Sequence, residues 1–390
     1  MTKKVLLTSI LTVFLLAMTF AQERLVVKGN KKYAEYSFSP AIDIYKKVID
    51  KGYVTSELLE KLGNSYYFNA NYEEAEKVYK QLIETYGSEV GPEYYFRYGQ
   101  TLKTLGDYRN SDSILARFAD MTSNDLRSKI IKTAKDYKEE IARNSGRYDI
   151  ELFEYNSKYS DFAPAFYKEG LIFSSDRDTG NLARYRHTWN SKDFLDIYKV
   201  NADSSSNNRV VKMNMLNSRL HESTSVATRD GTTIYFTRNN FVDGKSRKDE
   251  EGVVRLKIFR INRENGEWSE LEELPFNSDS YSVAHPALSP DEKTLFFAAD
   301  MADSKGASDI YKVSINEDGT FGLPMNLGAA VNTEARETFP FVSSENILYF
   351  SSDGHPGLGG LDIFATKIDN ENISNPVLNV GEPVNSNRDD

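Results

Sequence analysis

The chain has 390 residues, of which 39% are hydrophobic, and its formal net charge is −10. This acidic balance argues against nucleic acid as a partner and against direct docking on anionic lipid, because both need a basic surface. The absence of cysteine excludes disulfides, a thiolate nucleophile, a thiolate metal site and a lipid-modified cysteine. The length is sufficient for two hydrophobic cores, so stability must come from apolar burial.

The first residues have the features of an export signal. Lys3 and Lys4 give a positive start, residues 5–18 are apolar, and small residues end at Ala21. The apolar stretch is too short for a typical membrane-spanning helix. We therefore expect a signal peptide over residues 1–21, cleaved after Ala21, with an uncleaved membrane anchor as the alternative.

Residues 22–146 are predicted to form helical repeats, because apolar residues recur at intervals of three and four. Three glycines, spaced by 34 and 36 residues, mark the repeat: Gly29, Gly63 and Gly99. A small residue follows each glycine by 12 positions and a larger apolar residue follows by 16: Ala41, Ala75, Ser111, Tyr45, Tyr79 and Leu115. This pattern resembles the tetratricopeptide repeat, whose period is about 34 residues. A last helix near residues 124–142 is expected to cap the stack, with Gly146 as its stop.

Stacked helical repeats present a concave face made by the first helix of each pair. Two of the repeats place polar and aromatic residues on this predicted face: Asn64, Tyr67, Phe68, Phe96, Gln100 and Lys103. One interpretation is a groove that binds a peptide or a partner helix. The alternative is that these side chains pack within the stack or against the next domain.

From about residue 147 to 390, short aromatic and β-branched runs replace the helical period. An asparagine followed by Ser or Thr opens each unit, at intervals of 61, 60, 55 and 53 residues: Asn156, Asn217, Asn277, Asn332 and Asn385. Each of the first four units contains four predicted strands, the composition of a β-propeller blade. The clearest copy, residues 289–297 and 308–311, resembles the WD40-like repeat of the PD40 type found in TolB-related propellers.

The predicted fold is therefore multidomain α + β, an α-helical tetratricopeptide solenoid followed by an all-β propeller with four complete blades. A further predicted strand, residues 149–154, precedes the first Asn-Ser pair at the place of a fourth strand. We interpret it as a closing strand, and residues 385–390 as the start of another blade. This indicates a five-bladed ring cut short, and a four-bladed ring with the early strand left over is the alternative.

Aspartates recur at equivalent strand ends in the predicted blades: Asp176, Asp300, Asp353, Asp196, Asp309 and Asp362. Carboxylates at such positions accept hydrogen bonds from turn amides, so the repetition favours a structural role. A calcium site at residues 353–362 is the alternative, although its oxygen ligands lack an ordered spacing. The sequence shows no zinc-type histidine pair, nucleophile elbow or phosphate-binding glycine loop. We therefore predict no metal, no cofactor and no catalytic residue.

Two loops, residues 177–195 and 239–255, lengthen the first two blades between their second and third strands. They carry basic and aromatic residues that are predicted to bind partners at one rim of the propeller: Arg184, Tyr185, Arg186, Trp189, Lys245 and Arg247. The alternative is that both loops are solvated insertions without a binding role.

A signal peptide, helical repeats and PD40 blades in this order resemble a family of periplasmic, OmpA-family envelope proteins. Within it, the closest resemblance is to PorE-like proteins, which tether the type IX secretion and gliding machinery to the cell wall. The resemblance implies a periplasmic location associated with the outer membrane or cell wall. It also implies that peptidoglycan is bound only through an OmpA-like domain, which these residues do not contain.

The expected function is a non-enzymatic scaffold whose partners are envelope proteins of a secretion or motility machine. A propeller that binds carbohydrate or peptide during nutrient uptake is the main alternative. An enzyme with active residues at the propeller mouth is a third hypothesis.

Overall fold

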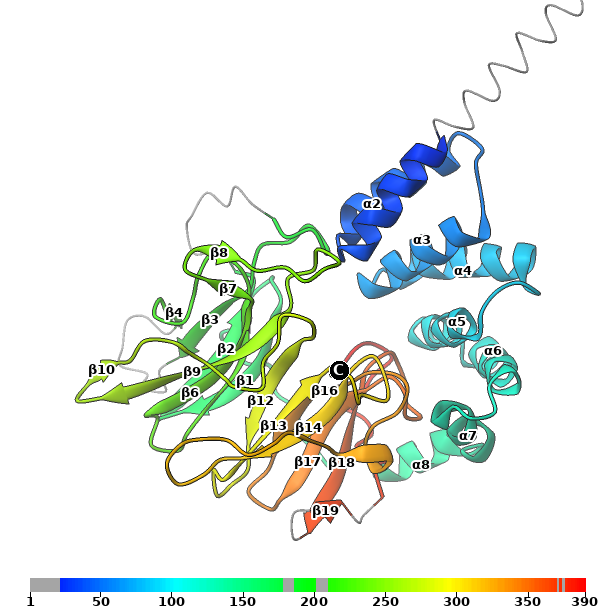
Figure 1. The fold of residues 1–390 in the computed structure, drawn as a ribbon. Helices are drawn as coiled ribbons and strands as arrows, with labels where there is room; N and C mark the ends of the chain where they lie inside the picture. The colour runs from blue at the N-terminus through cyan, green and yellow to red at the C-terminus, as the bar shows by residue number, and fades with distance from the viewer. Residues whose placement is uncertain (1–21, 178–185, 201–209, 370–371, 374–375) are drawn as a thin grey trace, which may run out of the picture. The chain divides into compact units, whose positions relative to one another are not determined.

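The computed structural model describes residues 22–177, 186–200, 210–369, 372–373 and 376–390 (Figure 1). They form two compact units. The helical unit extends to Phe118 and also includes His187–Lys192 and Glu251–Val253, while the propeller unit holds the rest from Ala119 onward. The predicted signal peptide lies outside the described residues. Every described helix is too short or too polar to cross a bilayer.

A helix over residues 22–34 opens the described chain. The helices that follow are α2 (Phe38–Ile49), α3 (Ser56–Phe68), α4 (Tyr72–Tyr86), α5 (Pro92–Thr104), α6 (Tyr108–Met121), α7 (Leu126–Thr133) and α8 (Tyr137–Asn144). Local sequence sets several of their ends. Thr55 caps α3 by accepting a hydrogen bond from the Leu58 N–H at 3.2 Å. Pro92 begins α5, where its missing N–H is not needed.

Each of the three repeat glycines, Gly29, Gly63 and Gly99, lies against the residue that follows it by 16 positions. A Cβ atom added at Gly63 would lie 2.6 Å from the ring of Tyr79, and one at Gly99 would lie 2.6 Å from the Leu115 side chain. Tyr79 is fully buried, and its hydroxyl donates to Asn64 Oδ1 at 2.8 Å. The paired helices therefore meet where only a glycine fits, which confirms the predicted tetratricopeptide arrangement.

The single capping helix predicted near residues 124–142 is two helices in the structure. Helix α7 ends at Thr133, because the next residue, Ala134, has a ψ of 55° outside the helical region, and α8 begins after Asp136. Both belong to the propeller unit rather than to the helical stack. Gly146, with a φ of 76°, follows α8 at the predicted stop, and its N–H donates to Glu382 O at 2.7 Å.

Four antiparallel sheets follow in chain order and form the predicted propeller blades (Figure 1). Blade 1 contains β1 (Asp161–Tyr167), β2 (Gly170–Ser175), β3 (Asp196–Val200) and β4 (Val210–Lys212). Blade 2 contains β5 (Glu222–Ala227), β6 (Thr233–Asn239), β9 (Leu256–Glu264), β10 (Glu267–Trp268) and β11 (Glu272–Glu273), and a hairpin of β7 (Phe241–Val242) and β8 (Lys245–Ser246) extends from it. Blade 3 contains β12 (Val283–Leu288), β13 (Thr294–Ala299), β14 (Asp309–Ser314) and β15 (Met325–Asn326), which η1 (Gly328–Ala330) follows. Blade 4 contains β16 (Glu337–Val342), β17 (Ile347–Ser352), β18 (Asp362–Asp369), β19 (Asn372–Ile373) and β20 (Leu378–Asn379).

Neighbouring blades pack face to face through buried apolar side chains. Each of three core clusters contains residues of two neighbouring blades: Ile172 and Phe236 for blades 1 and 2, Ile258 and Phe297 for blades 2 and 3, and Phe296 and Phe350 for blades 3 and 4. The inner strands β1, β5, β12 and β16 each contain a shift of register. In three of them the residue before a proline has a positive φ: Ala163, His285 and Phe339.

Four of the five opening asparagines bind the third strand of the preceding blade. Asn332 Oδ1 accepts the N–H of Ile310 in β14 at 2.8 Å, and its Nδ2 donates to the carbonyl of the same isoleucine at 3.0 Å. The same pair of bonds joins Asn217 to Ile197, Asn277 to Ile258 and Asn385 to Ile363. We call this arrangement the asparagine joint. It fixes the third strand of a blade to the turn that leads into the next unit.

The early strand predicted at residues 149–154 is not a strand in the structure. Residues 149–153 have no regular secondary structure, and the exposed fraction of Leu152 is 94%. The fourth strands of the other blades pair with a third strand, for example β20 with β18. No described strand pairs with residues 149–153 in this way, which explains why the segment stays irregular.

Candidate interaction surfaces

Five of the six residues predicted to line a concave groove are almost completely buried. Their exposed fractions lie between 3% and 4%: Asn64, Tyr67, Phe96, Gln100 and Lys103. Asn64 Nδ2 donates to the Tyr33 hydroxyl at 2.9 Å, and the Phe96 ring lies 5.1 Å from that of Phe118. These five side chains are packed in the structure and are not open to a ligand. This arrangement agrees with the alternative interpretation, in which they pack within the protein. Their role in partner binding stays a prediction.

The sixth residue, Phe68, belongs to an aromatic cluster in the helical unit. The Trp189 ring lies 4.8 Å from the Phe38 ring, and its Nε1 donates to the Phe68 carbonyl at 2.9 Å. The Tyr36 ring lies 5.9 Å from that of Trp189, and the Arg97 guanidinium lies 5.0 Å from the Phe68 ring. We call these five residues the aromatic cluster. Aromatic rings beside an arginine are typical of protein-binding hot spots.

The placement of Trp189 differs from the sequence interpretation, which assigned it to a propeller rim. The structure places it in the helical unit, in the segment His187–Lys192. Thr188 and Ser191 in the same segment bond to Ser37 and Ser39 at 2.9 and 2.6 Å. The physical reason is that an indole gains more from buried aromatic neighbours than from solvent.

The other predicted rim residues have different environments. Arg184 and Tyr185 lie outside the described residues. Arg186 is exposed, with its Nε 3.9 Å from Asp193. Lys245 and Arg247 are exposed on the β7–β8 hairpin, where no strand of a blade covers them.

Two further arginines lie against the hairpin, with their guanidinium groups 5.3 and 5.7 Å from the Phe241 ring: Arg219 and Arg238. We call residues 241–247 with Arg219 the basic hairpin. It is a cationic projection on an acidic chain, so it can attract an acidic partner.

The repeated aspartates bind turn amides, as their repetition predicted. Asp176, Asp300 and Asp353 accept hydrogen bonds from the N–H groups of Ser160, Ser282 and Arg336. Asp309 and Asp362 accept from two amides each in the loops before their strands. Asp196 accepts a hydrogen bond from the Lys212 ammonium at 2.5 Å, as Asp309 does from Asn326 Nδ2 at 2.7 Å.

Two buried glutamates at the start of inner strands bind the opening turns. Glu337 accepts the N–H and hydroxyl of Thr333, both at 2.7 Å, and Glu222 has the same two bonds with Ser218. Burial raises the pKa of Glu337 to about 8 and that of Glu222 to about 7. Both carboxyl groups therefore hold the opening turn of their unit.

Three partly buried histidines are also held by the fold. His355 Nε2 lies 2.8 Å from the Val331 carbonyl, and His221 Nδ1 accepts the Leu195 N–H at 3.0 Å. Burial lowers the pKa of His285 to about 3, and its Nδ1 lies 3.0 Å from Thr224 Oγ1. Within the described ranges, no three His, Asp or Glu side chains lie close enough to hold a metal ion.

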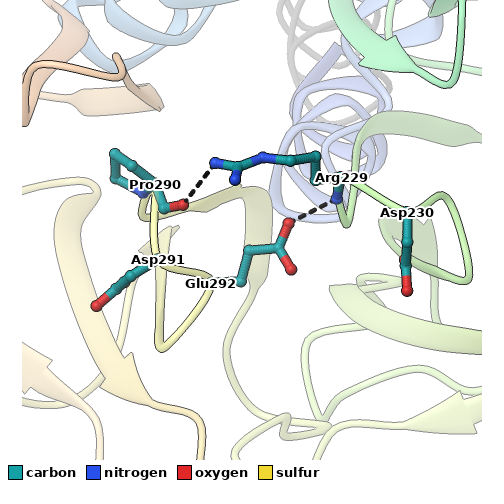
Figure 2. Close-up of a pocket in the computed structure, with 5 residues that line it drawn as sticks. All are labelled: Arg229, Asp230, Pro290, Asp291 and Glu292. Carbon is teal, nitrogen blue, oxygen red and sulfur yellow. Dashed lines mark hydrogen bonds between the residues drawn. The ribbon is translucent and has the colours of Figure 1, made fainter.

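A polar pocket of about 360 Å³ lies between the first turns of blades 2 and 3 (Figure 2). The Arg229 N–H donates to Glu292 at 2.5 Å, and the Arg229 guanidinium donates to the Pro290 carbonyl at 3.1 Å (Figure 2). The Thr228 hydroxyl lowers the pKa of Asp230, and the Ser289 hydroxyl lowers the pKa of Asp291. The carboxylates of Asp230 and Asp291 thus accept hydrogen bonds within their own turns. The pocket lies between two hairpins, and its lining residues do not form a set of convergent reactive groups.

A second pocket, of about 370 Å³, lies between the end of α8 and blade 4. The Tyr148 and Tyr349 hydroxyls lie 3.2 Å apart in its wall. Asn144, Arg147 and Lys367 add polar groups to the lining. This combination of tyrosine rings and amide or cationic groups suits a neutral polar ligand. The sequence did not indicate the pocket, because residues about 200 positions apart form it.

Comparison with protein families supports the helical repeats. A family model of the tetratricopeptide repeat matches residues 56–87 and 92–125. These ranges contain the second and third predicted copies, with Gly63 and Gly99. No curated protein matches the chain.

Three solved structures with similar folds are remote in sequence. TolB from Acinetobacter baumannii is 13% identical, with a TM-score of 0.35, over 57% of this chain and 44% of that chain. An alpha-L-arabinofuranosidase from Lactobacillus brevis is 13% identical, with a TM-score of 0.36, over 53% of this chain and 67% of that chain. A puromycin hydrolase is 12% identical, with a TM-score of 0.35, over 60% of this chain and 40% of that chain. The chain thus spans less than half the length of the TolB and hydrolase chains, and these similarities carry no argument about activity.

Proposed function

We propose that this protein is a non-enzymatic scaffold, exported to the periplasm, that binds protein partners at the boundary between outer membrane and cell wall. Tetratricopeptide stacks and propellers are both folds that mediate protein–protein interactions. The observation that carries the proposal is how polar groups are used. The repeated carboxylates bind turns, whereas the cationic residues Lys245, Arg247 and Arg219 are exposed in the basic hairpin. In the aromatic cluster, Tyr36 and Trp189 are 40% and 38% exposed.

The partners are proposed to be envelope proteins of a secretion or motility machine, including type IX secretion. This finer assignment rests on the resemblance of the domain order to PorE-like, OmpA-family proteins. Peptidoglycan would be bound through a separate OmpA-like domain and not by the residues described above. The charge of the basic hairpin favours an acidic surface on the partner.

A photo-crosslinking amino acid at position 245 tests the scaffold function. Lys245 is exposed on the basic hairpin, so its replacement should leave the fold unchanged. We expect crosslinks to a small set of envelope proteins, which charge reversal by Arg247→Glu abolishes. The matched control is a crosslinker at Lys138, an exposed lysine of α8 outside the hairpin. Equal crosslinking from both positions, or none from position 245, would count against the proposal.

The proposed location has its own test. Mass spectrometry of the protein from a cell envelope fraction should find an N-terminus at Gln22, because the predicted cleavage follows Ala21. Release of the protein by osmotic shock, with this N-terminus, supports a periplasmic chain. A protein that keeps residues 1–21 and stays with the membrane supports the anchor alternative.

A carbohydrate-binding propeller is the second candidate, and the pocket beside blade 4 favours it. Tyrosine rings that lie next to amide and cationic groups are suited to hydroxyl-rich ligands. Isothermal titration with envelope and dietary oligosaccharides measures this directly. Binding that Tyr349→Ala abolishes, without protein crosslinks at the basic hairpin, would favour this candidate over the scaffold.

A further inference from the structure

The segment His187–Lys192 is a closed turn that belongs to the helical unit, although the chain reaches it from the loop between β2 and β3. The His187 N–H donates to the Lys192 carbonyl at 3.1 Å, and the Ser191 N–H donates to the His187 carbonyl at 3.0 Å. Ser191, with a φ of 61°, helps the chain to reverse within the turn. The turn is therefore held by its own hydrogen bonds, and its large aromatic side chain is Trp189.

This turn provides partners for the ends of two helices. The first N–H groups and the last carbonyls of a helix have no partner within the helix itself. The Ser39 N–H, in the first turn of α2, donates to the Thr188 carbonyl at 3.1 Å. The Phe68 carbonyl, at the end of α3, accepts the Trp189 Nε1–H at 2.9 Å. Ser37 is the N-cap residue of α2, yet its hydroxyl bonds to the Thr188 hydroxyl and not to the helix.

Aromatic contacts hold the indole in place. The Trp189 ring packs edge to face on three rings of the helical unit, at centroid distances of 4.8, 5.9 and 6.4 Å: Phe38, Tyr36 and Phe68. Phe38 is only 2% exposed, whereas Trp189 is 38% exposed. The indole thus lies over the core of the helical unit without being part of it. It can leave this position while the core beneath it stays packed.

We propose that the ends of α2 and α3 form a binding site for a tryptophan-bearing turn of a partner protein, and that Trp189 occupies this site until the partner displaces it. Residues 187–192 are then an internal ligand that keeps the site closed. The inference rests on the proposed scaffold function and deepens it, because it gives the chemistry of one partner.

The contacts of the internal ligand define which partner fits. The Phe68 carbonyl selects tryptophan over phenylalanine, because the indole carries an N–H donor and the phenyl ring does not. Ser37 and the Ser39 N–H bind the hydroxyl and the carbonyl of the residue before the tryptophan. The Ser39 hydroxyl bonds to that of Ser191, two positions after the tryptophan, at 2.6 Å. The partner therefore presents Thr or Ser, then Trp, then any residue, then Ser, in a closed turn.

Isothermal titration calorimetry on the purified protein tests the site. The probe is a cyclised peptide of residues 186–193, and the comparison peptide contains 1-methyltryptophan, which lacks the indole N–H. We expect Trp189→Ala to bind the probe about tenfold more tightly than the wild-type protein, because this variant lacks the internal competitor. In the Trp189→Ala protein, the comparison peptide or a second substitution, Ser39→Ala, should weaken binding about fivefold, since each removes one hydrogen bond.

Two controls accompany the titration. Ser88→Ala changes an exposed serine after α4, away from both helix ends, and should leave binding to the Trp189→Ala protein unchanged. Circular dichroism checks that Trp189→Ala keeps its helices. If it does not, Trp189→Phe replaces it, because this variant keeps a ring and loses only the bond to Phe68. It should bind the probe about fivefold more tightly than the wild-type protein.

Several outcomes would overturn the proposal. They are absence of binding to a folded variant at millimolar probe, equal binding to variant and wild-type protein, and equal binding of the 1-methyltryptophan peptide. Dimerisation of the wild-type protein that the probe inhibits would show that a second copy is the occupant, and this also overturns it. The scaffold function is tested separately by crosslinks from position 245, so a failure of the probe to bind would remove this site alone.

Discussion

In the helical unit, each repeat is held by contact between a glycine and a bulky side chain 16 residues later, whereas in the propeller each blade is fastened by an asparagine amide. The first contact depends on shape: Gly63 leaves space that the Tyr79 ring fills. The second depends on polar atoms: Asn332 satisfies both backbone groups of Ile310. The two regions should therefore fail for different reasons, one by steric crowding and one by loss of hydrogen bonds.

The largest expected loss of stability comes from removing an asparagine joint. Asn332→Ala removes the partner of the buried Ile310 N–H and one of the two donors to the Ile310 carbonyl, and we expect the free energy of unfolding to fall by about 3 kcal/mol. Asn156→Ala removes the same side chain where it is exposed, and should change stability by less than about 0.5 kcal/mol. Urea unfolding followed by circular dichroism measures both. Equal losses would mean that the joint does not stabilise the blades through these bonds.

The next effect is a pH dependence of the propeller. Burial raises the pKa of Glu337 to about 8, above its usual value, so the folded state binds the proton more tightly than the unfolded chain. Its contribution is full at low pH and is lost as pH rises towards 8, so the free energy of unfolding should fall by about 3 kcal/mol between pH 5 and 8. Glu337→Gln should remove this slope, while Glu345→Gln, at an exposed position, should retain it. Unfolding curves at several pH values provide the measurement, and an unchanged slope in Glu337→Gln would contradict the assignment.

A smaller effect is expected from crowding in the helical unit. Gly63→Ala places a methyl group 2.6 Å from the Tyr79 ring, and we expect a loss of about 2 kcal/mol through overpacking. Gly91→Ala is the control, because its added Cβ would lie 3.9 Å from its nearest neighbour. Thermal unfolding followed at a helical wavelength compares the two. A stability gain in Gly63→Ala, from higher helix propensity, would show that the ring moves freely.

The smallest effect concerns the aromatic cluster. Trp189→Phe keeps an aromatic ring but removes the bond from Nε1 to the Phe68 carbonyl, and the helical unit should lose about 1 kcal/mol. Trp268→Phe, in blade 2, is the control and leaves Trp189 as the only tryptophan. In that variant, tryptophan emission should shift to longer wavelength as the helical unit unfolds. Emission that follows the propeller transition instead would place Trp189 with the blades.

The repeat spacings were sufficient to predict much of the fold. The glycines 34 and 36 residues apart predicted the helix pairs, and the recurring Asn-Ser and Asn-Thr sequences predicted four blades. The structural role of aspartates such as Asp353 also followed from repetition, because a group used in every blade is a poor candidate for a unique site.

Features that depend on distant partners could not be predicted in the same way. The asparagine joint pairs Asn217 with Ile197, and nothing in the local sequence names that isoleucine. Trp189 lies in a loop between two strands, yet its neighbours are Phe38 and Phe68 in the helical unit. The burial of Asn64 could not be predicted either, because its hydrogen-bond partners Tyr33 and Tyr79 lie on other helices.

The asparagine joint affects how propeller blades can evolve by duplication. Asn332 binds Ile310 through its backbone N–H and carbonyl, so a blade copied or exchanged by gene duplication does not need an isoleucine side chain at that position to be held in place. A further bond, from Asn332 Nδ2 to Asn326 Oδ1 at 2.8 Å, does depend on the neighbouring side chain. The flanking pairs differ, with Lys212 and Asp196 in one joint and Asn326 and Asp309 in another. The asparagine amide thus binds the same backbone groups in every blade, whereas the neighbouring side-chain pair differs from one blade to the next. Modules joined in this way can multiply while their surfaces diverge.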